Sequence, residues 1–241
     1  MKEVRLAIVS CGLFPTIEER NRKLWIFLRS CEKFNIKASF YGLGKTFPGY
    51  RAMMLDMQLD YLKLCRKNVS HVLFTDAWDA FFCSDIGEIV TKYIDYGSPP
   101  ILCSAYIGLG NESDMSKYEG CFDESIPYRY PNRGGYIAEV DAIIDAFDKM
   151  LSNTDLTGDD CMEWYRGWRE GWFRPKLDSE CQIFQVSDVN AKAEMTTHGT
   201  RLKNTLTNSE PCILHLSGGY TDQETGKDHV MIPWARALEI I

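Results

Sequence analysis

The sequence lacks the features that mark secreted, membrane-bound or zinc-binding proteins. It has no Cys-x-x-Cys pair, and its four histidines form no closely spaced pair, so a structural zinc site is not expected. No apolar run reaches the roughly 18 residues that span a membrane, and the first residues lack the apolar core of a signal peptide. The nine cysteines are odd in number and scattered, which indicates free thiols in a reducing compartment. These absences predict a cytoplasmic protein.

Composition and charge are those of an ordinary globular protein. Of its 241 residues, 45% are hydrophobic and 25% are charged, as is typical of water-soluble proteins. The 27 Lys and Arg residues against 34 Asp and Glu residues give a formal net charge of −7, which disfavours a large nucleic-acid-binding surface. No repeat, low-complexity tract or linker interrupts the chain, so we expect one domain over residues 1–241.

Apolar periodicity predicts strands that alternate with helices in the first half of the chain. A capping box of Thr16 and Glu19 opens an amphipathic helix that reaches about Asn35. The alternation predicts an α/β fold with a mostly parallel sheet, helices on both faces and a ligand site beyond the carboxyl ends of the strands. Strands are predicted at residues 6–9, 36–41, 71–75, 101–105, 136–140, 182–186 and 212–216, and further helices at about 51–67, 141–151 and 159–170.

Asp76 and Asp79 stand three residues apart in the apolar and aromatic segment 74–82. Buried carboxylates need compensation. At the end of a strand they can hold Mg²⁺ or Mn²⁺ and leave coordination positions open for a diphosphate. The alternative is a turn in which Asp76 caps a helix and Asp79 is solvated.

A second segment, residues 128–136, is aromatic and basic and runs through two glycines into a strand. Gly134 and Gly135 permit positive φ or a close approach of the backbone to a ligand. Asn132 and Arg133 can present donors to a sugar or a phosphate. A plain turn is the alternative.

Two further segments combine polar residues with helix or strand ends. Asp159 and Asp160 precede a helix rich in tryptophan, where they are either functional or simple capping residues, and the tryptophans are either sugar platforms or core. His215 stands near the end of an apolar strand before Ser217 and Gly218, as a metal ligand or a structural histidine.

Taken in order, these segments resemble the glycosyltransferase domain of the procollagen lysyl hydroxylases and its microbial and viral relatives, a GT-A-type family, over most of the chain. Two positions depart from the family pattern: Arg133 stands where Ser is usual, and Leu216-Ser217 where Gly-Asn is usual, so contacts to the donor sugar and phosphate are expected to differ. The matching segments are Asp76–Asp79 for an Asp-x-aromatic-Asp motif, 130–135 for Tyr-Leu-Asn-Ser-Gly-Gly, Asp159-Asp160 for an acidic cluster, 177–185 for Leu-Asp-x-x-Cys-x-Ile-Phe-Gln, and 215–218 for His-Gly-Asn-Gly.

The resemblance implies a metal-dependent enzyme that transfers a hexose, with glucose expected, from a UDP-sugar to a hydroxyl acceptor with retention of configuration. It implies Mn²⁺ or Mg²⁺ on Asp76, Asp79 and His215, and catalytic roles for Asp159 and Asp160. The acceptor hydroxyl would belong to a glycan, a protein side chain or a modified nucleobase. The implied contacts to the nucleotide sugar are Val9, Cys11, Arg51, Asp76, Trp78, Asn132, Gly134, Gly135, Ser217 and Gly218.

Two other functional classes remain open from the sequence. A metal-dependent phosphohydrolase or nucleotidyltransferase could use the same carboxylates, although the familiar Asp-x-Asp spacing is absent. A non-catalytic sugar-binding module could rely on the aromatic residues from Trp164 to Trp172.

Overall fold

The computed structural model describes residues 4–45, 52–108, 123–153, 160–188, 194–217 and 230–241. The strands of these residues are β1 (Leu6–Cys11), β2 (Ala38–Tyr41), β3 (His71–Thr75), β4 (Ala80–Phe82), β5 (Ile101–Tyr106), β6 (Tyr130–Glu139), β7 (Lys176–Asp178), β8 (Phe184–Asp188), β9 (Met195–His198), β10 (Arg201–Asn204) and β11 (Ile213–Ser217). The helices are α1 (Ile17–Lys23), α2 (Trp25–Lys33), α3 (Ala52–Cys65), α4 (Ile86–Asp95), α5 (Val140–Leu151), α6 (Asp160–Arg169) and α7 (Met231–Ala237).

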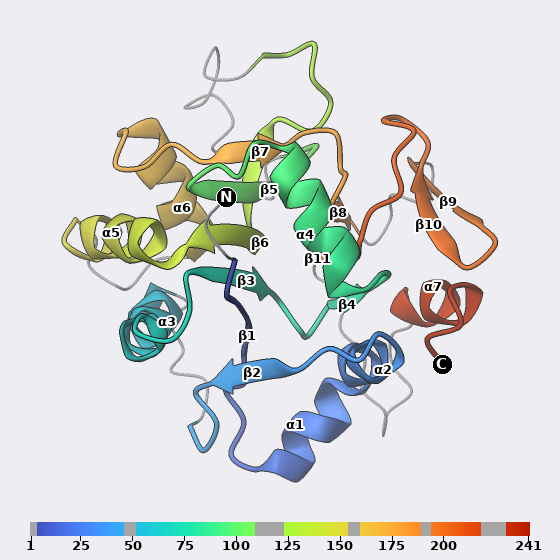
Figure 1. Cartoon of the computed structure of the whole chain (residues 1–241), viewed down its shortest axis with the longest axis horizontal. Helices are drawn as coiled ribbons and strands as arrows, with labels where there is room; N and C mark the ends of the chain where they lie inside the picture. The colour runs from blue at the N-terminus through green and yellow to red at the C-terminus, as the bar shows by residue number, and fades with distance from the viewer. Residues whose placement is uncertain (1–3, 46–51, 109–122, 154–159, 189–193, 218–229) are drawn as a thin grey trace.

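The central feature is a six-stranded mixed sheet in the order β2-β1-β3-β6-β5-β7 (Figure 1). Strand β6 runs antiparallel to both of its neighbours, whereas the other three pairings are parallel. A smaller sheet, β4-β11-β8, lies beside it, and β9 pairs with β10 in a hairpin. The predicted α/β class is confirmed, with one antiparallel strand inside the largely parallel sheet.

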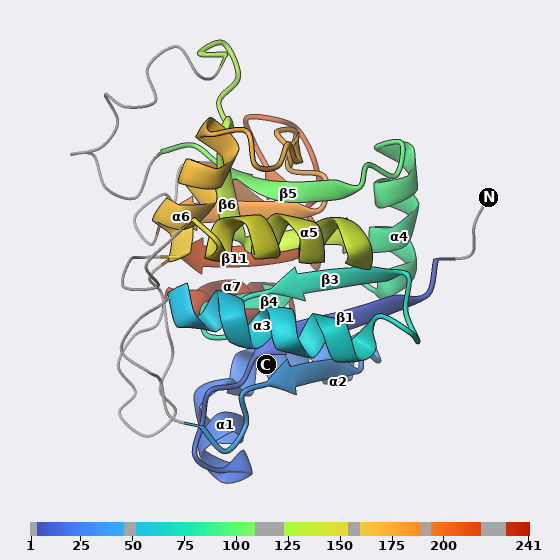
Figure 2. The same ribbon diagram turned by 90° about the vertical axis from the view of Figure 1, so that its left-hand side faces the viewer.

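Each face of the sheet packs against its own hydrophobic layer. Val9 and Phe74 point to the face covered by α3, α5 and α6, which lie in front of the strands in Figure 2. Their neighbours Ile8 and Leu73 point to the opposite face, against α2, α4 and the small sheet. This alternation follows from the two-residue period of a strand. All five residues of β3 are buried because both faces are covered.

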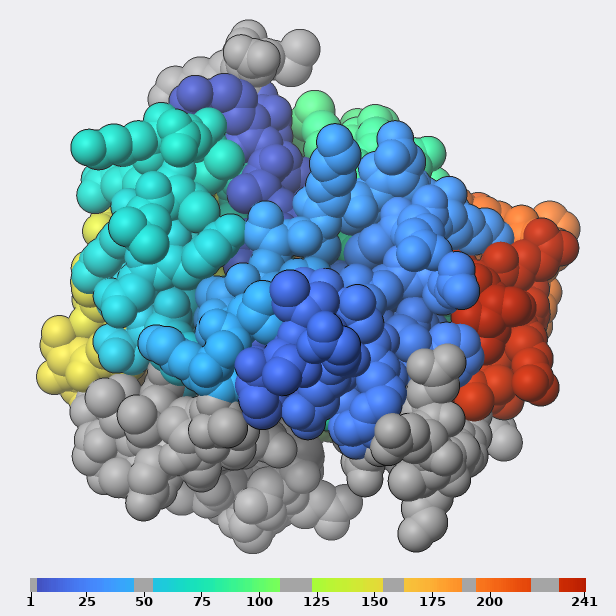
Figure 3. Space-filling model, turned by 90° about the horizontal axis from the view of Figure 1, so that it is seen from below, coloured from blue at the N-terminus to red at the C-terminus, as the bar shows by residue number. Residues whose placement is uncertain are grey.

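The helix predicted from Thr16 to Asn35 is instead two helices. Thr16 caps α1 as predicted, because its Oγ1 accepts a hydrogen bond from the backbone of Glu19 at 3.1 Å. Helix α1 ends at Lys23 and has no buried residue. Leu24, which follows it, has a buried side chain. The chain turns there so that α2 can pack on the sheet. Figure 3 shows these helices between α3 and α7.

The strand predicted at residues 136–140 also begins earlier than expected. Strand β6 already begins at Tyr130, because Tyr130 to Asn132 pair with β5 and Gly135 pairs with Thr75 of β3. The pairing with β5 is interrupted by a bulge: Cys103 faces Tyr136, but the next residue, Ser104, faces Asn132. Residues 133–135 therefore have no partners on β5, and a bulge of this kind re-aims side chains.

Two observations bear on the environment of the protein. No helix among the described residues is both long and apolar enough to cross a bilayer. The cysteines described as free thiols are Cys11, Cys31, Cys65, Cys83, Cys103, Cys181 and Cys212.

Candidate metal centre

Three potential metal ligands meet where the two sheets join. Asp76 directly follows β3, Asp79 directly precedes β4, and the four residues from Asp76 to Asp79 connect the large sheet to the small one. His215 lies in β11, opposite Ala80 of β4. The backbone N–H of Leu216 donates to the carbonyl of Asp79 at 2.8 Å, which fixes β11 against this connection.

The ligand atoms of this triad converge. One ligand atom each from Asp76, Asp79 and His215 lies within 4.8 Å of the other two. His215 Nε2 is 3.2 Å from Asp79 Oδ1 and 3.8 Å from Asp76 Oδ2. Two carboxylates and one imidazole are a donor set that suits a divalent cation such as Mn²⁺. The residues present therefore fit the metal that the sequence implies.

The two carboxylates of the triad affect the pKa of His215. Burial alone lowers the pKa of this histidine, but the charge and hydrogen bond of Asp79 and the charge of Asp76 raise it above its usual value. The His215 side chain is 7% exposed, and its Nδ1 has no hydrogen-bond partner among the described residues. The carboxylates are more open, so a ligand can reach them from solvent.

The glycine pair makes room for the triad. A Cβ atom at Gly134 would lie 2.2 Å from His215 Cε1, and one at Gly135 would lie 2.7 Å from the Phe184 ring. Neither glycine has a positive φ. The protein's own histidine and phenylalanine therefore approach this backbone closely, and a contact of the two glycines with a ligand stays a prediction.

Asn132 and Arg133 lie beside the triad on β6. Asn132 is buried, and its Oδ1 accepts a hydrogen bond from the backbone of Gly134 at 2.8 Å. The Arg133 side chain is 3% exposed, with Nη1 4.0 Å from Asp76 Oδ1 and its guanidinium 5.4 Å from the centre of the Phe74 ring. Asn132 thus shapes the backbone, and Arg133 brings a positive charge to the metal centre.

The remaining predicted site residues, nucleotide contacts and catalytic residues, are partly within and partly outside the described part of the chain. Val9 and Cys11 lie in β1 with buried side chains, and burial raises the pKa of the Cys11 thiol to about 11. Trp78 is half-buried and stacks on Phe14, with ring centres 4.7 Å apart. Ser217 is the last residue of β11. Arg51, Gly218 and Asp159 lie outside the described residues, as does the side chain of Asp160, the first residue of α6.

The tryptophan-rich helix contributes mainly to the core. Trp164 is fully buried and stacks on Tyr136 at 5.8 Å, so its rings offer no face to a ligand. Trp168 and Trp172 pack against the same core cluster. Arg166 lies over the Trp172 ring.

Asp178 is a buried carboxylate whose role the sequence did not reveal. Its oxygens accept hydrogen bonds from Tyr96 Oη at 2.5 Å and from the backbone N–H groups of Gln182, Ile183 and Phe184 at 2.7–2.9 Å. It thereby holds the chain that enters β8. The available signal was an aspartate that directly follows Leu177 and comes shortly before Ile183 and Phe184.

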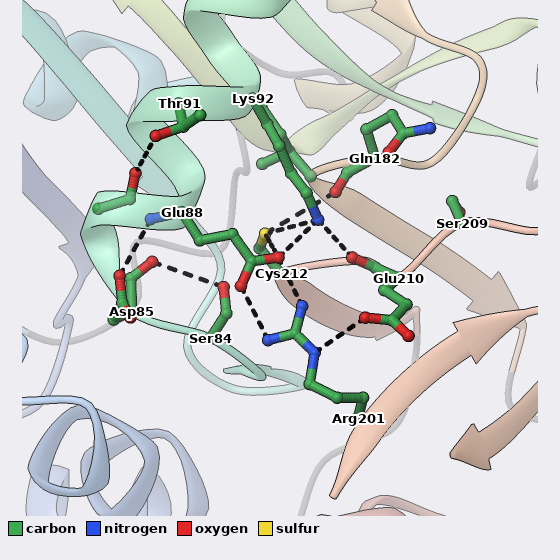
Figure 4. Close-up of polar contacts among 12 residues, drawn as sticks. Ser84, Asp85, Glu88, Thr91, Lys92, Gln182, Arg201, Ser209, Glu210 and Cys212 are labelled. Atoms are coloured by element: carbon green, nitrogen blue, oxygen red, sulfur yellow. Dashed lines mark hydrogen bonds and ion pairs between the residues drawn. The ribbon is translucent and has the colours of Figure 1, made fainter. Parts of the chain in front are cut away.

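A second polar cluster, which we call the ion-pair cluster, joins α4 to β10 and to the chain before β11 (Figure 4). Glu88 accepts two hydrogen bonds from Arg201, at 2.5 and 2.8 Å, and its carboxylate is 2.7 Å from Lys92 Nζ. Lys92 also donates to the carbonyl of Glu210, and Arg201 is 3.3 Å from the Glu210 carboxylate. Sequence reasoning missed this cluster because Glu88 and Arg201 are 113 residues apart.

The comparisons with known proteins agree with this architecture. The PLOD GT domain family matches residues 16–223. Among solved structures, a glycosyltransferase involved in the glycosylation of the major capsid of PBCV-1 superposes with a TM-score of 0.55 at 12% identity, covering 95% of this chain and 99% of that one. At that identity the likeness concerns the fold alone. No curated protein matches the sequence significantly.

Proposed function

Because this chain belongs to the PLOD GT domain family of glycosyltransferases, we propose that it transfers a hexose, with glucose as the expected sugar, from a UDP-sugar to a hydroxyl acceptor. The observation that carries the proposal is the convergence of Asp76, Asp79 and His215 between the two sheets. We further propose Mn²⁺ or Mg²⁺ as the cofactor and retention of anomeric configuration.

The triad explains how a nucleotide diphosphate could be activated as a leaving group. A bound divalent cation would act as a Lewis acid on the diphosphate, whose negative charge grows as the sugar leaves. Asp76 and Asp79 supply the negative charge that holds such a cation, and His215 supplies a neutral nitrogen ligand. The partial exposure of both carboxylates supports access for the diphosphate.

The other roles are proposed from the residues around the triad. Trp78 and the end of β1 at Val9 and Cys11 would receive the nucleotide, with Val9 contributing its backbone because its side chain is buried. Asp159 or Asp160, at the start of α6, would stabilise positive charge on the sugar ring or orient the acceptor hydroxyl.

The acceptor is proposed only as a class. A glycan, a protein side chain or a modified nucleobase can each present the hydroxyl. The free cysteines support the proposal of a reducing, cytoplasmic setting.

Of the rival functions, a sugar-binding module is disfavoured because Trp164 is buried and arginines lie over the rings of Trp168 and Trp172. A phosphohydrolase would use the same triad. Release of inorganic phosphate from a nucleotide in the absence of any sugar acceptor would identify the hydrolase.

The test is a screen of nucleotide sugars with and without Mn²⁺, read by thermal stabilisation and by release of UDP. We expect Mn²⁺ with UDP to raise the melting temperature more than UDP alone. Asp79→Asn should abolish the increment due to Mn²⁺, and the exposed Asp148→Asn should leave it intact. If Asp79→Asn retains the full increment, the metal assignment is wrong.

A further inference from the structure

Arg133 differs from an ordinary buried arginine in what it faces. Its Nη1 is 4.0 Å from Oδ1 of Asp76, whereas Oδ2 of the same carboxylate faces His215 Nε2 at 3.8 Å. One carboxylate oxygen of Asp76 thus lies near the Arg133 guanidinium, which is permanently charged, and the other lies near His215. The bulge in β6 is the backbone feature that aims Arg133 in this direction.

The guanidinium of Arg133 brings a permanent positive charge to Asp76, because it cannot lose its proton near pH 7. Three neighbouring groups, Cys11, Tyr41 and Tyr136, are neutral at that pH, since burial raises the pKa of each. The Arg133 side chain is 3% exposed, so its charge acts on Asp76 across a partly desolvated space, in which electrostatic interactions are stronger than in water.

From this geometry we propose that Arg133 is a positioning residue that acts as a built-in counter-charge of the triad: it keeps the affinity for a divalent cation low until a diphosphate binds. Because a histidine must be neutral to bind a metal ion, the two carboxylates and the guanidinium then sum to a formal charge of −1, against −2 without the guanidinium. A divalent cation alone gives the site a net charge of +1, which attracts the negatively charged diphosphate. The proposal rests on the proposed function of the triad.

Removal of the guanidinium should change the affinities for the cation and for the diphosphate in opposite directions. The guanidinium repels the cation, so its removal should tighten cation binding. It attracts the diphosphate, so its removal should weaken nucleotide binding to the metal-loaded protein. A residue that merely supports the fold would weaken both.

The experiment measures binding of Mn²⁺ alone to the full chain by the paramagnetic resonance signal of free Mn²⁺, and binding of UDP at saturating Mn²⁺ by calorimetry. Arg133→Gln removes the charge and retains much of the volume. We expect Mn²⁺ to bind at least about tenfold more tightly, because one unit charge has roughly that effect on a divalent ion several ångströms away even at the dielectric constant of water. Binding of UDP to the metal-loaded variant should be several-fold weaker.

The controls separate charge from packing. Arg133→Lys keeps the charge and should behave as the wild type. Arg29→Gln changes the net charge of the protein equally on the exposed surface, where Arg29 pairs with Glu32, and should change neither affinity. Arg133→Ser, the residue usual in the family, is the second charge-removing variant if Arg133→Gln does not fold, as judged by circular dichroism.

The outcomes distinguish this inference from the proposed function. If the folded charge-removing variant binds Mn²⁺ no more tightly than the wild type, Arg133 is not a counter-charge, whereas the triad still stands. If the wild-type protein shows no Mn²⁺ binding that Asp79→Asn removes, the metal assignment fails and the role of Arg133 fails with it.

Discussion

The triad and the ion-pair cluster are both places where carboxylates meet cationic groups, but they are built differently. In the ion-pair cluster, Glu88 lies 2.5–2.8 Å from Arg201 and Lys92, and each cation has a further partner in Glu210. In the triad, His215 Nε2 lies 3.2 Å from Asp79 and 3.8 Å from Asp76, and the neighbouring Arg133 lies 4.0 Å from Asp76.

These differences suit the ion-pair cluster to a structural role and the triad to a binding role. Close ion pairs satisfy each other and join distant segments, so the ion-pair cluster serves to fasten α4 to the β9–β10 hairpin. The carboxylates of the triad lie instead at a partly exposed edge between two sheets, where a divalent cation can reach their oxygens from solvent. Strand β11 and the residues before it connect the two places, since Cys212 touches Lys92 and His215 belongs to the triad.

The largest expected effect comes from breaking the geometry of the triad without touching its ligands. Gly134→Ala places a methyl group against the His215 ring, which must move or tilt. Because a displacement of about 1 Å can cost about 10²-fold in rate, we expect turnover to fall by at least that factor. Gly108→Ala is the control, since among the described residues its Cβ would meet only Tyr106, at 3.9 Å. Steady-state kinetics with the best UDP-sugar measures the loss, and an unchanged rate would show that the contact is dispensable.

A second prediction extends the comparison to the carboxylates at the start of α6. Asp160→Asn should lower turnover by about 10²-fold with little change in the affinity for UDP with Mn²⁺, because a carboxylate that stabilises positive charge acts mainly in the transition state. Asp159→Asn is the companion variant, since one of two adjacent carboxylates can cap the helix while the other acts. Kinetics and calorimetry on the same preparations measure both quantities. Joint loss of stability, binding and rate would make Asp160 a capping residue.

A third prediction concerns Trp78, between the two aspartates. Trp78→Ala should weaken UDP binding by about 1–3 kcal/mol if the indole packs on the nucleotide, the range of base–aromatic stacking. Calorimetry with saturating Mn²⁺ gives the affinity. The structure shows Trp78 stacked on Phe14, so Phe14→Leu is the control that perturbs the stack but retains the indole. Equal affinities in wild type and Trp78→Ala would assign the tryptophan to packing alone.

The smallest effect is expected at the ion-pair cluster. Burial raises the pKa of Glu88, but the hydrogen bonds and charges of Arg201 and Lys92 outweigh it and lower the pKa below its usual value. A lowered pKa adds stability that is present above the unfolded value and is lost as the pH falls through the folded one. Urea unfolding should show that Glu88→Gln is less stable than wild type near pH 7, by about 1 kcal/mol or less. This difference should shrink as the pH falls below about 4.5. A difference that is constant with pH would contradict the ionic origin.

Short-range pattern was enough to predict much of the fold. The fully apolar middle of residues 71–75 gave β3 with its observed bounds, and periodicity located α3 and α5 within two residues. The triad could be proposed because both aspartates follow a strand and His215 lies near the end of another. The family resemblance then indicated that these segments, which lie far apart in the sequence, form one site. No local pattern could indicate this.

The rest depends on contacts between distant residues. The break at Leu24 arises because α2 must pack on the sheet, and the start of β6 at Tyr130 is set by pairing with β5. Sequence reasoning gave Arg133 a contact to the donor, whereas its place beside Asp76 follows from a bulge that only the paired strands reveal. Asp178 likewise acquires its role from Tyr96, 82 residues away.

Because of the bulge in β6, the geometry of the site also depends on how many residues this segment contains. Residues 133–135 are accommodated in β6 without any counterpart on β5. Because successive side chains of a strand point to opposite faces, the loss of one residue there would exchange the faces of the residues that precede it. Asn132 would then point away from the Gly134 backbone, while Tyr136 and the rest of the strand kept their places. In evolution or in design, this segment should tolerate changes of side chain far better than changes of length.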